Sequence, residues 1–319
     1  MEMVKIDNFF SDEFLQRERL KSNTDIVSIF CIAGLAVNLV LGFVLGVFGL
    51  YEDFTVYMLT MVVVTVISML CVGWICAKFC GGMKACIKKY EKKTGLSDNF
   101  LLVLFGFSGC MTVNLILTII SLFFPFIGSS NIDISEMNIY NVMLMMFAVA
   151  LAPAICEEIA FRGFVMGSLS DFGQGFAVIM TSVFFGMLHG NLSGILFAFS
   201  TGLLMGCVRK TSGSLVPSMI VHFLNNAYAV CSLCFMKMAD GEEGLMMYAV
   251  FSFIFMLMMV VVFVISMLML NSKNIGIFTF SSGDCVLTTS EKAKIVLTRP
   301  LFWVFMAFAG IITVLSLGA

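Results

Sequence analysis

Long apolar runs, separated by short polar segments, dominate the 319-residue chain. A helix that crosses a membrane needs about 20 consecutive, mostly apolar residues. The pattern predicts an all-α fold, a polytopic transmembrane helix bundle of about eight to nine spans, of which the fifth and sixth are short. The predicted spans are Ile26–Leu50, Phe54–Ala77, Phe100–Ile127, Ile139–Phe161, Gly175–His189, Gly194–Val208, Leu215–Phe235, Leu245–Leu270 and Leu301–Leu317.

Composition supports a membrane protein and excludes most soluble classes. Hydrophobic residues make up 60% of the chain and charged residues 12%, with a mean hydropathy of +1.05. Soluble domains average about 45–50% apolar and about 25% charged residues. The net charge of −2 offers no basic surface for nucleic acid, so we expect the lipid bilayer as a partner and no nucleic acid. Most of the 11 cysteines lie in apolar runs, where a free thiol behaves as a small hydrophobe.

The distribution of charge between the spans predicts an orientation. Cytosolic loops of membrane proteins are enriched in Lys and Arg. If the N-terminus is cytosolic, every Lys and Arg except Lys237 falls on the cytosolic side, and the opposite loops (52–53, 131–136 and 240–243) are acidic or neutral. We also expect a cytosolic loop or short helix at Gly81–Asn99, and a hairpin that pairs Ile275–Phe280 with Cys285–Thr289 in a second cytosolic loop.

Ionisable side chains inside membrane spans are costly and point to function. Glu157 and Glu158 end an apolar run, and Arg162 follows one turn after Glu158. Both histidines of the chain, His189 and His222, also lie in apolar runs. Asn226 follows His222 at the i,i+4 spacing that brings two side chains to one helix face, as Arg162 follows Glu158.

The depths of these residues in the bundle are compatible. Glu157 lies 16 residues before Gly173 and His189 lies 16 residues after it, so each is roughly 20 Å from a turn near Gly173. His222 lies about ten residues after the next turn on the same side. Pro153 kinks or loosens the helix just before the two acids and makes room for water. The sequence therefore predicts that these groups converge within the bilayer.

Two kinds of chemistry fit this set of residues. A carboxylate and an imidazole in a low-dielectric cavity can share a proton and activate water, while a His and an Asn can hold the oxyanion that forms from a carbonyl. Glu157, His189 and His222 could instead bind one Zn²⁺ ion that carries a water. The chain has no HExxH sequence and no Gly-x-Ser-x-Gly sequence in a span. The residues alone leave both chemistries open.

Three motifs in order carry a resemblance to a known family. Glu157–Arg162 reads EExxxR, Phe185–His189 reads FxxxH and His222–Asn226 reads HxxxN. Over about Ile139–Phe235 the chain resembles the CAAX-protease and bacteriocin-processing (CPBP or Abi) family of intramembrane proteases. The resemblance implies an endopeptidase, of glutamate or metalloprotease type, whose substrate is a peptide or protein at the membrane.

The resemblance also implies a role for each motif residue. Glu157 and His189 would activate water, and His222 and Asn226 would stabilise the oxyanion. The supporting residues would be Glu158, Arg162 and Phe185. It further implies a bacterial cell membrane, and three parts of the chain: an N-terminal cytosolic segment with three spans (1–138), a protease core (139–236), and C-terminal spans with a cytosolic loop (237–319).

Two other functions are compatible with the same pattern. A non-catalytic immunity or scaffold protein would need a pocket that binds a peptide or a membrane protein, but no proton chemistry. A proton-coupled transporter would use the Glu and His side chains as a relay. The chain shows no internal repeat of the kind that many transporter folds contain.

Overall fold

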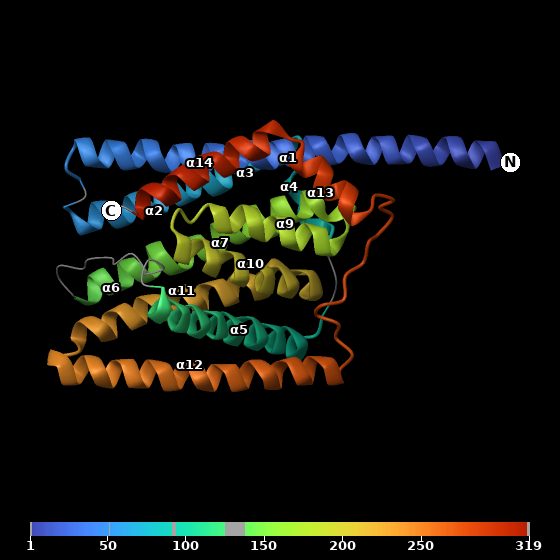
Figure 1. Ribbon diagram of the computed structural model, residues 1–319. Coiled ribbons are helices and arrows are strands. Elements are labelled where there is room, and N and C mark those ends of the chain that lie inside the picture. The colour runs from blue at the N-terminus through green and yellow to red at the C-terminus, as the bar shows by residue number, and fades with distance from the viewer. Residues whose placement is uncertain (1, 51, 91–93, 125–137, 318–319) are drawn as a thin grey trace.

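The computed structural model describes residues 2–50, 52–90, 94–124 and 138–317, with the side chains of 2–11 left out. The described residues form helices and no strand, which confirms the all-α prediction (Figure 1). The elements are α1 (Glu2–Val47), α2 (Phe54–Thr65), η1 (Val66–Cys71), α3 (Val72–Lys78), α4 (Met83–Lys88), α5 (Leu96–Phe123), α6 (Ile139–Met145), η3 (Met146–Leu151), α7 (Ala152–Glu157), η4 (Glu158–Val165), α8 (Met166–Leu169), η5 (Ser170–Phe172), α9 (Gln174–Met187), α10 (Leu192–Ser212), α11 (Leu215–Met238), α12 (Gly241–Ser272), α13 (Thr289–Leu297) and α14 (Pro300–Ser316).

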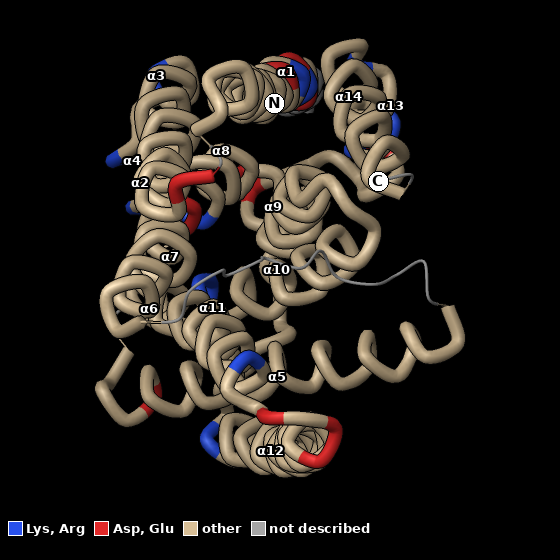
Figure 2. Tube along the Cα trace, turned by 90° about the vertical axis from the view of Figure 1, so that its left-hand side faces the viewer, with Lys and Arg blue, Asp and Glu red and all other residues tan. Residues whose placement is uncertain are grey.

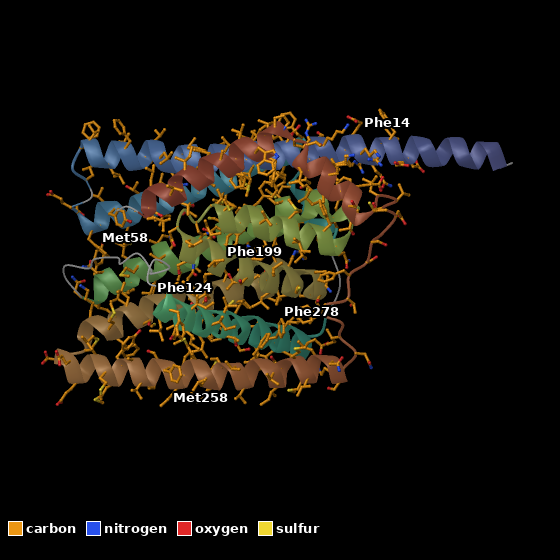
Figure 3. All side chains as sticks on the ribbon, in the orientation of Figure 1. Phe14, Met58, Phe124, Phe199, Met258 and Phe278 are labelled. Atoms are coloured by element: carbon orange, nitrogen blue, oxygen red, sulfur yellow. The ribbon has the colours of Figure 1, made fainter. Side chains whose placement is uncertain are left out.

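The helices pack as a layered bundle with an apolar outer surface. Seen end-on, α1 and α14 lie at one edge, α12 at the opposite edge, and α9 and α10 between them (Figure 2). Large hydrophobic side chains cover the outer faces of α1 and α12, as lipid contact requires (Figure 3). In the described part of the chain, seven helices are long and apolar enough to cross a membrane, or eight if α13 and α14, bent by 71°, form one span.

The predicted fifth span is too short to cross a membrane. It corresponds to α9, whose 14 residues extend for only about 21 Å. The chain then reverses at Gly190, which has a φ of 64°, and Asn191 caps α10 by accepting a hydrogen bond from the Gly194 N–H at 2.7 Å. Since α10 packs along α9, these two helices form a hairpin whose tip carries His189. The predicted end of the third span and the acidic segment 131–136 lie outside the described residues.

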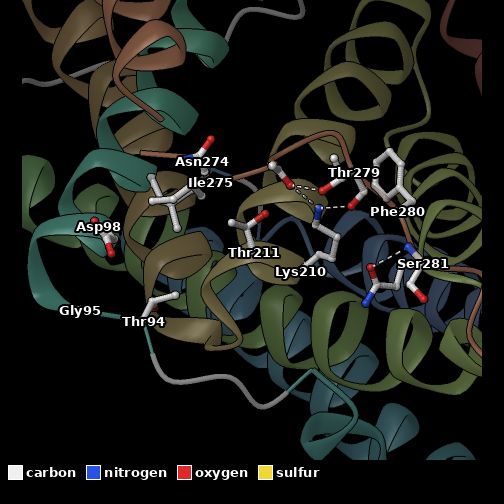
Figure 4. A pocket seen from close by; sticks show the side chains of 13 residues that line it. Thr94, Gly95, Asp98, Lys210, Thr211, Asn274, Ile275, Thr279, Phe280 and Ser281 are labelled. Carbon is white, nitrogen blue, oxygen red and sulfur yellow. Dashed lines mark hydrogen bonds between the residues drawn. The ribbon is translucent and has the colours of Figure 1, made fainter. Parts of the chain in front are cut away.

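The expected β-hairpin between residues 275 and 289 is wrong. Its first strand cannot form a ladder, because the buried Lys210 Nζ donates to the carbonyls of Gly276, Ile277 and Thr279 at 3.1, 3.0 and 2.8 Å (Figure 4). The segment is therefore an irregular loop tied to α10 by one ammonium group. By contrast, the expected short helix between residues 81 and 99 is present as α4.

Polar contacts gather at the end of the bundle where α1 begins. Asp171 contacts Lys89 at 2.8 Å and Arg19 at 3.3 Å, and Lys273 contacts Asp98 at 2.7 Å. We call the end of the bundle that carries these five residues the basic end. The clustering of Lys and Arg at one end agrees with the sorting of charge in the sequence.

The basic end also anchors α13 against α1. Arg17 forms an ion pair with Glu291, and Arg299 Nε donates to Asp25 Oδ1 at 3.0 Å. Glu291 closes a capping box with Thr288 at the start of α13. The hydrogen bonds from Thr288 and the charge of Arg17 lower the pKa of the Glu291 carboxyl. These contacts fix the C-terminal helices to the first helix of the chain.

Close packing at Gly167 generates a stability prediction. A Cβ atom there would lie 2.7 Å from the carbonyl carbon of Cys86 in α4 and closer to its oxygen. Because both partners are backbone, we expect Gly167→Ala to lower the free energy of unfolding by about 1–3 kcal/mol. The matched control is Gly310→Ala in α14, where a Cβ meets nothing within 4 Å. Thermal unfolding in detergent should show a lower midpoint for the first variant only; equal midpoints would contradict the packing.

Candidate active site

Two π-helical segments interrupt the helix that carries the acidic pair. They are η3, from Met146 to Leu151, and η4, which begins at Glu158 and includes Arg162. Single π turns within α-helices frequently occur at functional sites, because the wider turn redirects side chains and frees backbone groups. Glu157 is the last residue of the α-helical turn between them, so the two acids stand at the junction of two helix geometries.

Pro153 and Asn226 are linked through one backbone carbonyl. Proline has no N–H, so Pro153 gives no hydrogen bond to the carbonyl of Val149, four residues earlier. Asn226 Nδ2 on α11 donates to that oxygen at 3.0 Å. Asn225 Nδ2 in turn donates to Asn226 Oδ1 at 3.2 Å, which fixes the orientation of the amide. The carbonyl that Pro153 leaves without its α-helical donor is therefore bonded by the Asn of the third motif.

The second of the two acids, Glu158, forms a fully buried ion pair with Arg162. Arg162 Nη1 is 2.9 Å from Glu158 Oε1, and both side chains are inaccessible to solvent. The same oxygen accepts a hydrogen bond from His222 Nδ1 at 3.0 Å. Since the Glu158 carboxylate can only accept, Nδ1 of His222 is the donor; the hydrogen of a neutral His222 is therefore on Nδ1, and its Nε2 is free to take part in chemistry.

Glu157 has a different environment from Glu158. Its Oε2 lies 3.7 Å from His222 Nε2, and no Arg or Lys forms an ion pair with it in the described structure. Its side chain is partly exposed, unlike that of Glu158. His222 therefore stands between two carboxylates, of which only one is neutralised by a cation.

Phe185 connects the second histidine to this group. Its ring centroid lies 4.9 Å from that of His189 and 6.1 Å from that of His222, and Arg162 Cζ lies 4.5 Å from it. His189 Nδ1 is 3.0 Å from the carbonyl oxygen of Phe185. A carbonyl can only accept, so a neutral His189 carries its hydrogen on Nδ1 and keeps a basic Nε2.

Glu157 and His189 line one large cavity of about 1230 Å³. The other wall comes from helices outside the predicted protease core, which sequence reasoning did not connect to the site. His222 and Asn226 are not among the lining residues, but each contacts a residue that is. His222 lies beside Glu157, and Asn226 donates a hydrogen bond to the Val149 carbonyl. The lining residues are Gly34, Leu35, Asn38, Leu39, Gly42 and Phe43 of α1; Met61, Thr65, Ser68 and Met69 of α2 and η1; Ala148, Val149, Pro153, Glu157, Phe161, Phe185, Leu188, His189, Gly190 and Asn191; and Ile312 and Ser316 of α14.

The residues considered for zinc do not form a metal centre. Among the described residues, no group of three His, Cys, Asp or Glu side chains could hold a metal ion. The nitrogens of His222 face Glu158 and Glu157, and Nδ1 of His189 faces a backbone carbonyl. No step below is routed through a metal ion.

Comparison with known proteins agrees with the three motifs. Residues 139–228 match the family model described as Rce1-like, type II CAAX prenyl endopeptidase Rce1-like. No curated protein and no solved structure matches the chain. All three motifs lie within the matched residues, and the surrounding apolar helices make the chain an integral membrane protein. Residues 139–228 are thus similar to the family of type II CAAX prenyl endopeptidases.

Proposed function

We propose that this protein is an intramembrane endopeptidase that hydrolyses a peptide bond with a water activated by Glu157 and His189. The observation that supports it most is the position of Glu157, a carboxylate with no Arg or Lys ion-pair partner among the described residues, on the wall of a cavity shared with His189. Carboxylates in such apolar surroundings can accept a proton in a transition state.

The two adjacent acids have different tasks in this proposal. Glu158 forms an ion pair with Arg162 and accepts a hydrogen bond from His222. It therefore positions these two side chains and does not take a proton from water. Glu157 is the general base. Removing the cation from the pair would leave an uncompensated charge below the site, which is why the positioning pair matters for stability as well as for catalysis.

The reaction balances with these groups alone. The oxygen of the water attacks the carbonyl carbon of the substrate while its proton passes to Glu157, assisted by the basic Nε2 of His189. The carbonyl oxygen becomes an oxyanion, which a protonated Nε2 of His222 stabilises. The C–N bond then breaks as the proton passes from Glu157 to the leaving nitrogen.

Asn226 has two roles in this proposal. One N–H of its amide supports the Val149 carbonyl, and the proposal assigns the remaining N–H to the oxyanion. The substrate is a peptide or protein segment at the membrane. The matched family name refers to CAAX prenyl endopeptidases, so a prenylated C-terminal peptide is one probe to test.

Glu157→Gln should abolish cleavage. The amide cannot accept the proton, and loss of a general base lowers rates by roughly 100- to 10,000-fold. The measurement is cleavage by purified protein of a farnesylated CAAX peptide and of an unmodified transmembrane peptide. A second readout compares membrane peptides in a deletion strain with those in the parent, to identify the natural substrate.

The matched control is Glu242→Gln, an exposed carboxylate in the first turn of α12, which should cleave as the wild type does. Full cleavage by purified Glu157→Gln would remove the mechanism. If the deletion strain is restored equally by both variants, the protein acts instead as a non-catalytic immunity or scaffold protein.

Arg162→Leu should destabilise the fold. It leaves the buried Glu158 carboxylate without its cation, a change that typically costs about 3–5 kcal/mol. The double variant Glu158→Gln/Arg162→Leu removes both charges and should recover part of the loss. Unfolding midpoints in detergent measure both effects; a single variant as stable as the wild type would show that the pair is not a structural constraint.

A double-mutant cycle should separate the two roles of Asn226. Asn226→Ala leaves the Val149 carbonyl without its side-chain partner and should lower stability by about 1 kcal/mol. In a Pro153→Ala background the restored N–H can serve that carbonyl, so the stability loss should shrink while the loss of kcat remains. If both losses disappear together, Asn226 acts through the kink alone.

A further inference from the structure

We propose that the active-site cavity opens away from the basic end and admits an uncharged, apolar segment of a membrane-inserted polypeptide from that side. This inference rests on the proposed function and names the substrate class of the same site. It concerns the helices at the two ends of the chain, α1, α2 and α14, which complete the cavity wall.

Exposure along α1 shows where the cavity opens. On the face of α1 that lines it, the exposed fraction rises from 5% at Leu35 to 47% at Leu39 and 72% at Phe43. This direction leads toward Val47, the end of α1 that is farthest from the basic end (Figure 1).

The two other wall helices give the same direction. In the α2–η1 helix, which runs opposite to α1, exposure rises from 8% at Met69 to 40% at Met61, toward the start of α2. In α14, Ile312 is half-buried and Ser316, the last residue of the helix, is exposed. Three independent helices thus place the mouth at the end opposite to Arg19 and Asp171.

An aromatic cluster closes the cavity toward the basic end. Phe30 of α1 is buried edge-on against Phe161 and Phe164, with ring centroids 5.7 and 5.6 Å apart. Phe161 also packs on Phe185 at 5.0 Å. A polypeptide would have to displace these rings to reach Glu157 from the basic side, so the open mouth is the route of access.

The chemistry of the wall selects an apolar occupant. No Lys or Arg is among the described residues that line the cavity, so a free C-terminal carboxylate meets no cation there. The polar side chains that α1, α2 and η1 contribute are bonded to their own helices: Asn38 Nδ2 donates to the Gly34 carbonyl at 2.8 Å, and the hydroxyls of Thr65 and Ser68 donate to carbonyls four residues earlier. The wall therefore offers mainly hydrophobic contact.

The sorting of Lys and Arg in the sequence predicts that the basic end is cytosolic. The mouth then faces the non-cytosolic leaflet. The substrate would be a segment that lies in that leaflet or passes through it, with its scissile bond reaching the middle of the bundle.

Labelling from each side of the membrane tests this inference without any need for activity. Asn38→Cys at the mouth is treated with a membrane-impermeant maleimide in right-side-out and inside-out vesicles. Ser22→Cys, on the same helix but exposed at the basic end, is the matched control, and native Cys285 in the loop before α13 marks the same end. Peptides are resolved by mass spectrometry, because the chain has 11 native cysteines.

We expect Asn38→Cys to be labelled in the vesicle orientation in which Ser22→Cys and Cys285 are not. Labelling of all three from one side, or of Asn38→Cys from neither side, overturns the proposed mouth.

A second measurement tests whether a transmembrane peptide enters the cavity through this mouth. A bulky maleimide on Asn38→Cys should block cleavage of a transmembrane peptide, whereas the same label on Ser22→Cys should not. Unchanged cleavage after labelling at residue 38 overturns the route. If the wild type cleaves no probe, the proposed function fails, while the labelling pattern still decides where the cavity opens.

Discussion

The buried contact among Glu158, Arg162 and His222 is the constraint on which the site depends. Two charges removed from water are costly, and close pairing between them offsets part of that cost. Here one carboxylate oxygen serves both the guanidinium and the imidazole, at 2.9 and 3.0 Å. This arrangement locks α11 to η4 and turns His222 Nε2 toward Glu157. Because the first acid is not needed for this pairing, it remains available to the cavity. The different environments of the two carboxylates are thus a consequence of which acid is buried, and the sequence Glu-Glu alone does not reveal them.

A second constraint beside the acids is the backbone carbonyl that Pro153 leaves without an α-helical donor. A proline inside a membrane helix leaves a carbonyl without its usual donor, and no water is at hand in lipid to replace it. Here a π-helical segment precedes Pro153, and a side-chain amide from another helix donates to the Val149 carbonyl. An Asn at this position therefore has a structural reason to be present whether or not the protein is catalytic. The same contact ties α11 to the helix that carries Pro153, and so helps to set the distance between His222 and Glu157.

Much of the fold could be predicted from sequence because length and hydropathy limit what a membrane helix can be. The fifth of the nine predicted spans is wrong because periodicity and composition do not distinguish a 14-residue helix in a hairpin from a full crossing, although Gly190 and Asn191 signalled the turn. The prediction of a β-hairpin failed because the buried Lys210 binds the backbone carbonyls of the first strand. This long-range contact has no local signal in the sequence. The equal spacing of Glu157 and His189 from one turn anticipated that they share a cavity. Their catalytic roles, like those of His222 and Asn226, remain predictions.

Sequence motifs do not predict the parts of the cavity wall that α1 and α14 form. Apolar residues that face a cavity and apolar residues that face lipid have the same composition, so Leu35 or Ile312 carries no signal in one sequence. Their importance is geometric: they decide how wide the cavity is and toward which end it opens. Since the family match covers only residues 139–228, the reactive groups lie within the matched segment while most of the outer wall lies beyond it. Under the proposed function, the helices that flank the core would therefore set which substrate reaches the motif residues and from which side of the membrane it comes.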